Sequence, residues 1–167
     1  PSAVAISPSE TRIALGEALQ YSVTVSKGSV ARLSFSSDAP NVATVDAGGR
    51  VTAVGVGTAH ITVTTHNGKR AVATLHVCYP PITVRLSPKT VVLGSGMTAQ
   101  MEARINASSV GTYIYRSEAP DIVSVDANGV VIAREVMQER LVRVTVVTNN
   151  GKVDSSLVRV LPAPNRI

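Results

Sequence analysis

Three histidines are the side chains best suited to chemistry, because imidazole nitrogens bind metal ions and carry protons near neutral pH. His60, His66 and His76 all fall between residues 57 and 77, in an expected hairpin. A zinc site would need them to converge within a second shell of partners. The expected strand alternation instead directs His60 and His76 away from the core and places His66 in the loop. We interpret all three as solvent-facing side chains and predict no metal site.

Two aspartates recur in similar short segments. Asp46 begins Asp-Ala-Gly-Gly and Asp126 begins Asp-Ala-Asn-Gly, so Gly49 and Gly129 close the two segments. A calcium loop is one interpretation, but calcium takes roughly six to eight oxygen ligands, more than these segments offer. We therefore predict structural turns, in which the aspartate caps the turn and the glycine adopts a positive φ.

Other reactive patterns are weak. Gly55-Val56-Gly57 is similar to part of a phosphate loop but opens no helix that could hold a phosphate. Cys78 has no histidine partner that a third residue could hold in place, and no serine lies in a Gly-x-Ser-x-Gly elbow. We expect no enzymatic activity and no cofactor.

Charge and hydropathy argue against two further classes. The net charge is +5, from 16 Lys and Arg against 11 Asp and Glu, and the basic residues are spread along the chain. Nucleic-acid-binding proteins gather such charge on one face, so we expect no nucleic-acid partner. No apolar run approaches the roughly 18 residues of a membrane span. The chain begins at Pro1 without Met or a signal peptide, so we expect a processed chain or a fragment of a longer protein.

The chain repeats itself at an offset of about 80 residues. Residues 37–49 read SDAPNVATVDAGG and residues 117–129 read SEAPDIVSVDANG, with mostly similar side chains exchanged. Shorter matches extend the repeat: Ser7-Pro8 with Ser87-Pro88, Leu15-Gly16 with Leu93-Gly94, and Asn67-Gly68-Lys69 with Asn150-Gly151-Lys152. We infer a tandem duplication with small insertions and deletions in the loops.

Each repeat has the pattern of short strands separated by turn residues. Valine-rich runs of alternating polarity favour strands over helices. In the first repeat we expect strands at residues 3–7, 12–15, 19–25, 30–35, 43–45, 51–54, 57–65 and 69–77. Short strands at this spacing predict an antiparallel sandwich.

The last hairpin of the first repeat can be predicted residue by residue. Its two apolar strand faces reach one core only if the connecting loop has an odd number of residues. The loop His66-Asn67-Gly68 meets this condition with Gly68 in the left-handed conformation, and Gly151 takes the same place in the second repeat. The predicted pairs are Val63 with Ala71, Ile61 with Ala73, and Ala59 with Leu75.

The segment Cys78-Tyr79-Pro80-Pro81 joins the two repeats. Proline fixes its own φ and restricts the residue before it, so this linker is short and stiffened. We predict two domains, residues 1–79 and 80–167. Because Cys78 is the single cysteine, an internal disulfide is excluded.

These residues resemble the bacterial immunoglobulin-like domain, group 2. The second repeat is similar but departs after Ala133, where residues 134–140, REVMQER, replace a Gly-Thr-Ala motif. The resemblance covers nearly the whole chain and rests on SSDAPNVATVD at 36–46, on Gly49, on Val51-Thr52-Ala53 and on Gly57-Thr58-Ala59 with the hairpin that follows.

The resemblance implies an all-β chain of two tandem immunoglobulin-like antiparallel β-sandwiches. Domains of this family occur in intimin- and invasin-type adhesins, in phage virion proteins and beside secreted glycan-degrading enzymes. In most of these proteins the domain holds another part of the protein in position.

Tyr113 and Tyr115 are the candidate glycan-stacking residues, since they share one face of a strand. The same parity matches Leu33 and Phe35 of the first repeat, which favours a place in the core. Asn106 begins an Asn-Ala-Ser sequence that fits the N-glycosylation pattern, which matters only in a eukaryotic secretory pathway.

Two arginines have an expected role at strand edges. We interpret Arg143 and Arg159 as charges that discourage edge-to-edge pairing of exposed strands.

We therefore expect a non-catalytic structural and adhesion module of an exported cell-surface, envelope or virion protein. It would be extracellular, at the cell surface or periplasmic, or lumenal in a eukaryote, and would act as a semi-rigid stalk or spacer presenting a neighbouring domain of a longer chain. Two alternatives stay open: a module that binds a host protein or a glycan, and an accessory spacer of a secreted glycan-active enzyme.

Overall fold

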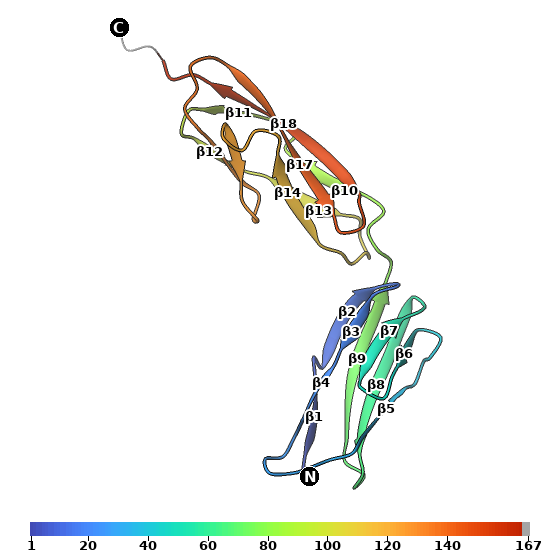
Figure 1. Ribbon diagram of the computed structural model, residues 1–167. Helices are drawn as coiled ribbons and strands as arrows, with labels where there is room; N and C mark the ends of the chain where they lie inside the picture. The colour runs from blue at the N-terminus through green and yellow to red at the C-terminus, as the bar shows by residue number, and fades with distance from the viewer. Residues whose placement is uncertain (165–167) are drawn as a thin grey trace. The chain divides into compact units, whose positions relative to one another are not determined.

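The computed structural model describes residues Pro1–Pro164, which form 18 strands and no helix (Figure 1). Contacts divide the chain into two compact units. The first comprises Pro1–Pro80 with Ser108–Val110, and the second comprises Pro81–Ala107 with the residues from Gly111 onward. Each unit is an all-β sandwich, which confirms the predicted fold class. The exact boundary between residues 79 and 80 stays a prediction.

The first unit contains a four-stranded sheet, a three-stranded sheet and one further strand pair. The large sheet has the order β2 (Glu10–Ala14), β9 (Arg70–Cys78), β8 (Gly57–Thr65), β5 (Leu33–Ser37). The small sheet has the order β3 (Ala18–Gln20), β7 (Arg50–Ala53), β6 (Ala43–Val45), while β1 (Val4–Ser7) pairs with β4 (Ser22–Val25). In Figure 1 the hairpin of β8 and β9 runs through the middle of the large sheet.

The second unit repeats this topology strand for strand. Its large sheet has the order β11 (Thr90–Gly94), β18 (Val153–Leu161), β17 (Arg140–Thr148), β14 (Tyr113–Ser117). Its small sheet has the order β12 (Thr98–Gln100), β16 (Val130–Ala133), β15 (Val123–Val125), while β10 (Val84–Ser87) pairs with β13 (Glu102–Ile105). The duplication read from the sequence therefore extends to the order of the strands.

One strand pair in each unit is parallel, and the other pairs are antiparallel. β2 runs parallel to β9, and β11 runs parallel to β18. Only two residues separate β1 from β2, yet these strands belong to different sheets. The chain thus crosses between the sheets without turning back, and β2 joins β9 in the same direction.

The hairpin of β8 and β9 confirms the predicted register. Val63 lies opposite Ala71, Ile61 opposite Ala73 and Ala59 opposite Leu75. The N–H of Gly68 donates to the carbonyl of Thr65 at 2.9 Å, and Gly68 has a φ of +81°. The three-residue loop therefore forms as the parity of the apolar residues requires.

Two expectations about the strands are wrong. The segment 19–25 is not one strand, because it breaks at buried Tyr21: β3 pairs with β7, whereas β4 pairs with β1. The N–H of Tyr21 donates to the carbonyl of Gly49 at 3.1 Å at this change of sheet. The strand expected at 30–35 begins only at Leu33, and Val30 is almost fully exposed.

The structure also corrects one detail of the repeat. Gly16 corresponds to Gly96, not to Gly94: both have positive φ, and both donate to the carbonyl of the last residue of the facing strand, Ala53 or Ala133. The offset is thus 80 residues up to Ala133. The loop after it has six residues, 134–139, where the first unit has three, 54–56, so the last hairpins are offset by 83.

Each unit has its own apolar core, built from alternate residues of its strands. In the first unit the long hairpin contributes Ala59, Ile61, Val63, Ala73, Leu75 and Val77. In the second unit the corresponding hairpin contributes Val142, Val144, Val146, Val158 and Val160. Within Pro1–Pro164 no helix is long and apolar enough to cross a membrane.

Candidate functional site

The two aspartate segments form matching turns. Oδ1 of Asp46 accepts hydrogen bonds from the N–H groups of Gly48 (2.8 Å) and Arg50 (2.9 Å). Asp126 makes the same two bonds to the second and fourth residues after it, both at 2.9 Å. Gly49 and Gly129 follow with φ of +82° and +83°. In each segment, therefore, one carboxylate oxygen caps a turn that the following glycine completes.

His60 and His76 lie on the outer face of the first unit's large sheet, each beside a carboxylate. Nδ1 of His60 lies 2.7 Å from Oδ2 of Asp38, and the His60 N–H donates to Oδ1 of the same aspartate at 2.7 Å. This backbone hydrogen bond, aided by the imidazole, lowers the pKa of Asp38 below its ordinary value. Nε2 of His76 lies 2.9 Å from Oε1 of Glu10.

The three histidines do not converge. His66 is exposed in the loop between β8 and β9, apart from the pairs that His60 and His76 make. Among the described residues no group of three or more His, Cys, Asp and Glu side chains is placed to hold a metal ion. His60 and His76 thus each contact a carboxylate on the surface of the sheet.

The segment between the units begins at the end of β9. Cys78 is the last residue of that strand, partly buried, and its carbonyl accepts from the N–H of Leu15 at 2.8 Å. Tyr79 is exposed, whereas Pro81 is buried within the second unit. Nδ2 of Asn150 donates to the carbonyl of Pro81 at 2.7 Å.

This contact of Asn150 belongs to a hairpin-loop motif that the sequence reasoning missed. Thr148 is buried; its Oγ1 donates to Oδ1 of Asn150 (2.6 Å) and accepts from the N–H of Lys152 (2.8 Å). The first unit has the same bonds at Thr65, and there Nδ2 of Asn67 donates to the carbonyl of Pro1 at 2.8 Å. The available signal was the Thr-x-Asn-Gly-Lys pattern, which both repeats contain.

The two tyrosines of β14 point inward and hold a neighbouring strand. Their rings meet edge to face with centroids 5.8 Å apart. Tyr115 packs against the core, and its hydroxyl oxygen accepts from the N–H of Ala103 at 3.1 Å, while the Tyr113 hydroxyl donates to the Ala103 carbonyl at 3.1 Å. Tyr113 lies at the margin, 37% exposed. Asn106 accepts through Oδ1 from the N–H groups of Ile82 (2.9 Å) and Thr83 (3.2 Å).

The clearest difference between the units is the loop between β16 and β17, residues 134–139. In the first unit the shorter loop lies directly against the turn before β6: a Cβ on Gly55 would overlap the carbonyl oxygen of Asn41. In the second unit the loop follows the turn only at Arg134, whose N–H donates to the Ile122 carbonyl at 2.8 Å. Beyond that point Val136 packs on the core and Met137 is almost fully exposed.

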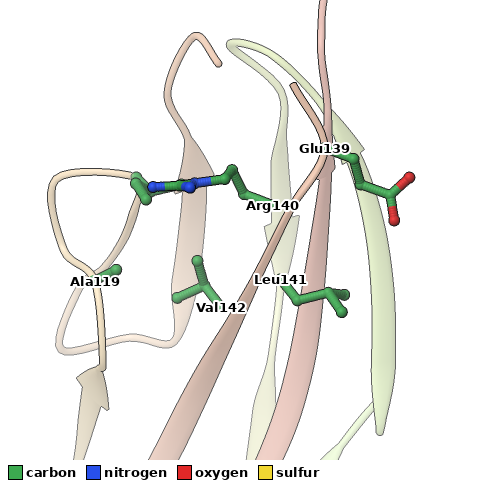
Figure 2. Close-up of a pocket in the computed structure, with 6 residues that line it drawn as sticks. Ala119, Glu139, Arg140, Leu141 and Val142 are labelled. Carbon is green, nitrogen blue, oxygen red and sulfur yellow. The ribbon is translucent and has the colours of Figure 1, made fainter. Parts of the chain in front are cut away.

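The longer loop opens a shallow hollow beside the start of β17. Two adjoining parts, of about 470 and 380 Å³, share Ile122 and Arg140. Ala119, Ile122 and Val142 supply apolar walls. Figure 2 shows the Arg140 side chain extending toward the segment that carries Ala119, whereas Glu139 points to the other side of the strand.

The hollow offers both charged and apolar groups to a ligand. Arg140 offers a permanent positive charge with several N–H donors, which suits a carboxylate or sulfate. Glu139 does not neutralise it, because its oxygens bond Nε and Nη2 of Arg159 at 2.7 and 2.8 Å. This bond lowers the pKa of Glu139. The hollow thus sets Arg140 beside apolar walls, and the carboxylates of Asp121 and Glu135 line its second part. The only signal for it in the sequence was the break in the repeat after Ala133.

The paired four- and three-stranded sheets of each unit define the class of immunoglobulin-like sandwiches. Residues 2–75 match the family of bacterial Ig-like domains (group 2), which confirms the resemblance for the first repeat. The second unit is tied to the first by the internal repeat. No curated protein matches the sequence significantly.

Solved structures show similar folds at low identity. The fibronectin(III)-like modules of Clostridium thermocellum CbhA align with 95% of this chain and 93% of theirs, at 17% identity and a TM-score of 0.51. Domains 1–6 of the surface layer protein SbsC align at 20% identity and a TM-score of 0.43, over 87% of this chain but 24% of theirs. An intimin fragment in complex with the intimin-binding domain of its receptor Tir aligns at 17% identity and a TM-score of 0.39, over 95% and 63%. The chain therefore spans about a quarter of the SbsC chain and under two thirds of the intimin fragment.

Proposed function

We propose that this chain is a non-catalytic structural module of an exported protein, in which sandwich units hold a neighbouring domain away from a cell or virion surface. The observation that carries the proposal is duplication: the same sandwich occurs twice, and each copy buries an apolar core of its own. A unit that needs no other part of the chain for its core can be repeated to lengthen a spacer. The match of the first repeat to the bacterial Ig-like family supports an exported, surface-associated location.

In this proposal the two domains follow each other along the chain with a short connection between them. Only Tyr79 and Pro80 separate the end of β9 from Pro81, which the loop of the last hairpin holds. We place the boundary between residues 79 and 80, with Cys78-Tyr79-Pro80-Pro81 as a restricted linker.

Replacing the first unit in the full-length parent tests the spacer role. In one variant, residues 1–79 are exchanged for an unrelated sandwich of similar length, and in another they are deleted. Attachment or activity displayed at the surface should survive the exchange and fall on deletion. In solution, the extracted parent should have the same activity in all three forms. Loss of function on exchange, with the parent still folded and displayed, would show that the first unit acts through its own residues and is not a spacer.

A binding role for the second unit is a further candidate, favoured by the hollow at Arg140. The purified chain is screened against glycans and extracellular-matrix proteins at low and moderate salt, because a protein of net charge +5 adheres to acidic polymers when screening is weak. A ligand retained at moderate salt should be lost in Arg140→Ala and kept in Arg134→Ala, which removes an equal charge from the loop. Equal binding by both variants would exclude the hollow.

A further inference from the structure

The outer faces of the two large sheets differ in polarity at six corresponding positions, although the strands correspond one to one. Outward positions alternate with the buried ones along each strand. Pairing of β8 with β9 and of β17 with β18 matches these positions between the units. Six of them are polar in the first unit and apolar in the second: Arg12 and Val92, Ser34 and Ile114, Thr58 and Leu141, Thr64 and Val147, Arg70 and Val153, Thr74 and Leu157.

The apolar side chains of the second unit are well exposed and form two groups, separated by the polar row of Arg116, Thr145 and Ser155. Five of them keep between 41% and 65% of their surface in water: Val92, Ile114, Leu141, Val153 and Leu157. Leu141 lies opposite Arg159, which pairs in turn with Val92, and Ile114, Val147 and Val153 stand in one row across the sheet. The fold itself does not require them, because the first unit builds the same face mainly from Thr, Ser and His. Groups of exposed apolar residues on one sheet face are typical of an interaction surface.

The charged side chains on the strands of this face are arginines, and two of the three pair with glutamates beside the sheet. On the four strands of the sheet, all within the described residues, the outward-facing charges are Arg116, Arg143 and Arg159. Arg143 pairs with Glu118 (3.5 Å) and Arg159 with Glu139, both just outside the strands, while Arg116 has no ion-pair partner among the described residues. The same rows in the first unit carry His60 and His76, so the second unit has permanent charges where the first has titratable ones.

We propose that the outer face of the sheet β11-β18-β17-β14 docks a partner protein that presents carboxylates beside apolar side chains. Arginine is enriched in protein interfaces because its planar guanidinium binds a carboxylate bidentately and packs on apolar groups. This docking function goes beyond the spacer role and does not depend on it.

Three other occupants fit the face less well. Glycans and single-stranded nucleic acids stack on exposed aromatic rings, whereas the exposed apolar groups here are aliphatic. A second copy packed face to face would offer Arg116 no unpaired carboxylate, because Glu118 and Glu139 already bind Arg143 and Arg159. Protein with complementary acidic charge therefore suits the surface best.

Amide chemical shifts of the whole chain, followed during titration with defined probes, test this proposal. The probe is a short synthetic peptide of alternating leucine and glutamate; leucine–lysine and serine–glutamate peptides and heparin are compared with it. We expect shifts on the outward residues of β17 and β18 for the leucine–glutamate peptide, with binding at least about tenfold weaker for the two other peptides. Heparin binding as tight as that of the peptide at moderate salt would overturn the proposal in favour of a polyanion site.

Variants that replace residues of the second unit by the corresponding residues of the first test whether this face makes the contact. Leu141→Thr with Leu157→Thr restores the threonines found at 58 and 74, and should weaken peptide binding about tenfold or more. Arg116→Gln should weaken it without altering the apolar groups. Val72→Thr, at an equally exposed position of the first unit, should have no effect.

Each contrary result is decisive. Undiminished binding by the double threonine variant, shifts confined to the free edge of β14, or no binding at millimolar peptide would overturn the proposal. Concentration-dependent dimerisation that the double variant abolishes would assign the face to a second copy instead.

Discussion

Buried hydroxyl groups distinguish the two cores at the level of single residues. Tyr21 of the first unit corresponds to Met101 of the second, and Phe35 corresponds to Tyr115, so each core places one phenol at a different position. The Tyr115 hydroxyl oxygen accepts from the Ala103 N–H at 3.1 Å. The Tyr21 hydroxyl is buried with no hydrogen-bond partner among the described residues, and burial raises its pKa.

Removing each hydroxyl should therefore have opposite effects. Tyr21→Phe should leave the free energy of unfolding unchanged or raise it by about 1 kcal/mol, because an unsatisfied polar group leaves the core. Tyr115→Phe should lower it by about 1 kcal/mol, because the Ala103 N–H loses its acceptor. Urea unfolding of the whole chain measures both. A larger loss in Tyr21→Phe than in Tyr115→Phe would show that the Tyr21 hydroxyl has a partner.

The Asp38–His60 pair predicts how acid affects the first unit. The pKa of Asp38 is lowered in the folded chain, chiefly by the His60 N–H, so ionised Asp38 favours folding. This contribution is complete above the ordinary aspartate pKa of 3.8 and is lost as the pH falls from there through the lower folded value. Unfolding followed at the amides of the first unit should show this loss. Asp38→Asn should flatten the dependence in that window, and an unchanged profile would contradict it.

At the level of strands and turns, the glycines with positive φ differ in the space that a Cβ would find. Gly151 lies in the hairpin loop with open space where a Cβ would be, whereas a Cβ on Gly129 would overlap the carbonyl oxygen of Met101. Gly49 is equally confined in the first unit, since a Cβ there would lie 2.7 Å from Cζ of Phe35. The turns after Asp46 and Asp126 are therefore packed against the neighbouring strands, and the hairpin loops are not.

Alanine at these glycines should separate strain from crowding. Gly151→Ala should lower the free energy of unfolding by about 1 kcal/mol, the penalty of a left-handed conformation alone. Gly129→Ala should lower it by about 3 kcal/mol or more, because the turn must also move away from the Met101 carbonyl. Thermal unfolding of both variants gives the comparison. Equal losses would mean that the turn at Gly129 shifts freely.

The interpretation of Arg143 and Arg159 as edge protection is wrong at this scale. β17 and β18 are the two central strands of their sheet, and β11 and β14 form its edges. Both arginines point outward from the middle of the sheet and pair with glutamates next to it. Their position on a face, not at an edge, is what makes that face a candidate docking surface.

At the level of the whole molecule, the two units have separate apolar cores. We therefore predict that each unit stays folded without the other. A protease recognition sequence inserted between Tyr79 and Pro80 allows the folded chain to be cut at the proposed boundary. Both pieces should keep the amide spectra of their cores, because no core residue of one unit comes from the other. The uncut chain with the same insertion is the control. Unfolding of either piece on cleavage would reject two autonomous domains.

Local rules account for the features that the sequence predicts well. The parity of apolar residues in the hairpin 57–77 and the need for a left-handed glycine depend on neighbours a few residues away, so the loop at Gly68 and the pairing of Ile61 with Ala73 follow directly. The aspartate turns follow for the same reason. The duplication and the family resemblance are likewise visible in the residues themselves.

Contacts between distant segments decide the rest. The break at Tyr21, the parallel pairing of β2 with β9 and the late start of β5 depend on which sheet each strand joins, and local alternation is the same in either sheet. The hollow at Arg140 exists because a six-residue loop must close a gap that three residues close in the first unit. In the sequence, the Leu, Val, Ile and Arg residues of the apolar, arginine-bearing face lie far apart. Only strand pairing brings those side chains together, because residues of different strands become neighbours through hydrogen bonds that no short segment specifies.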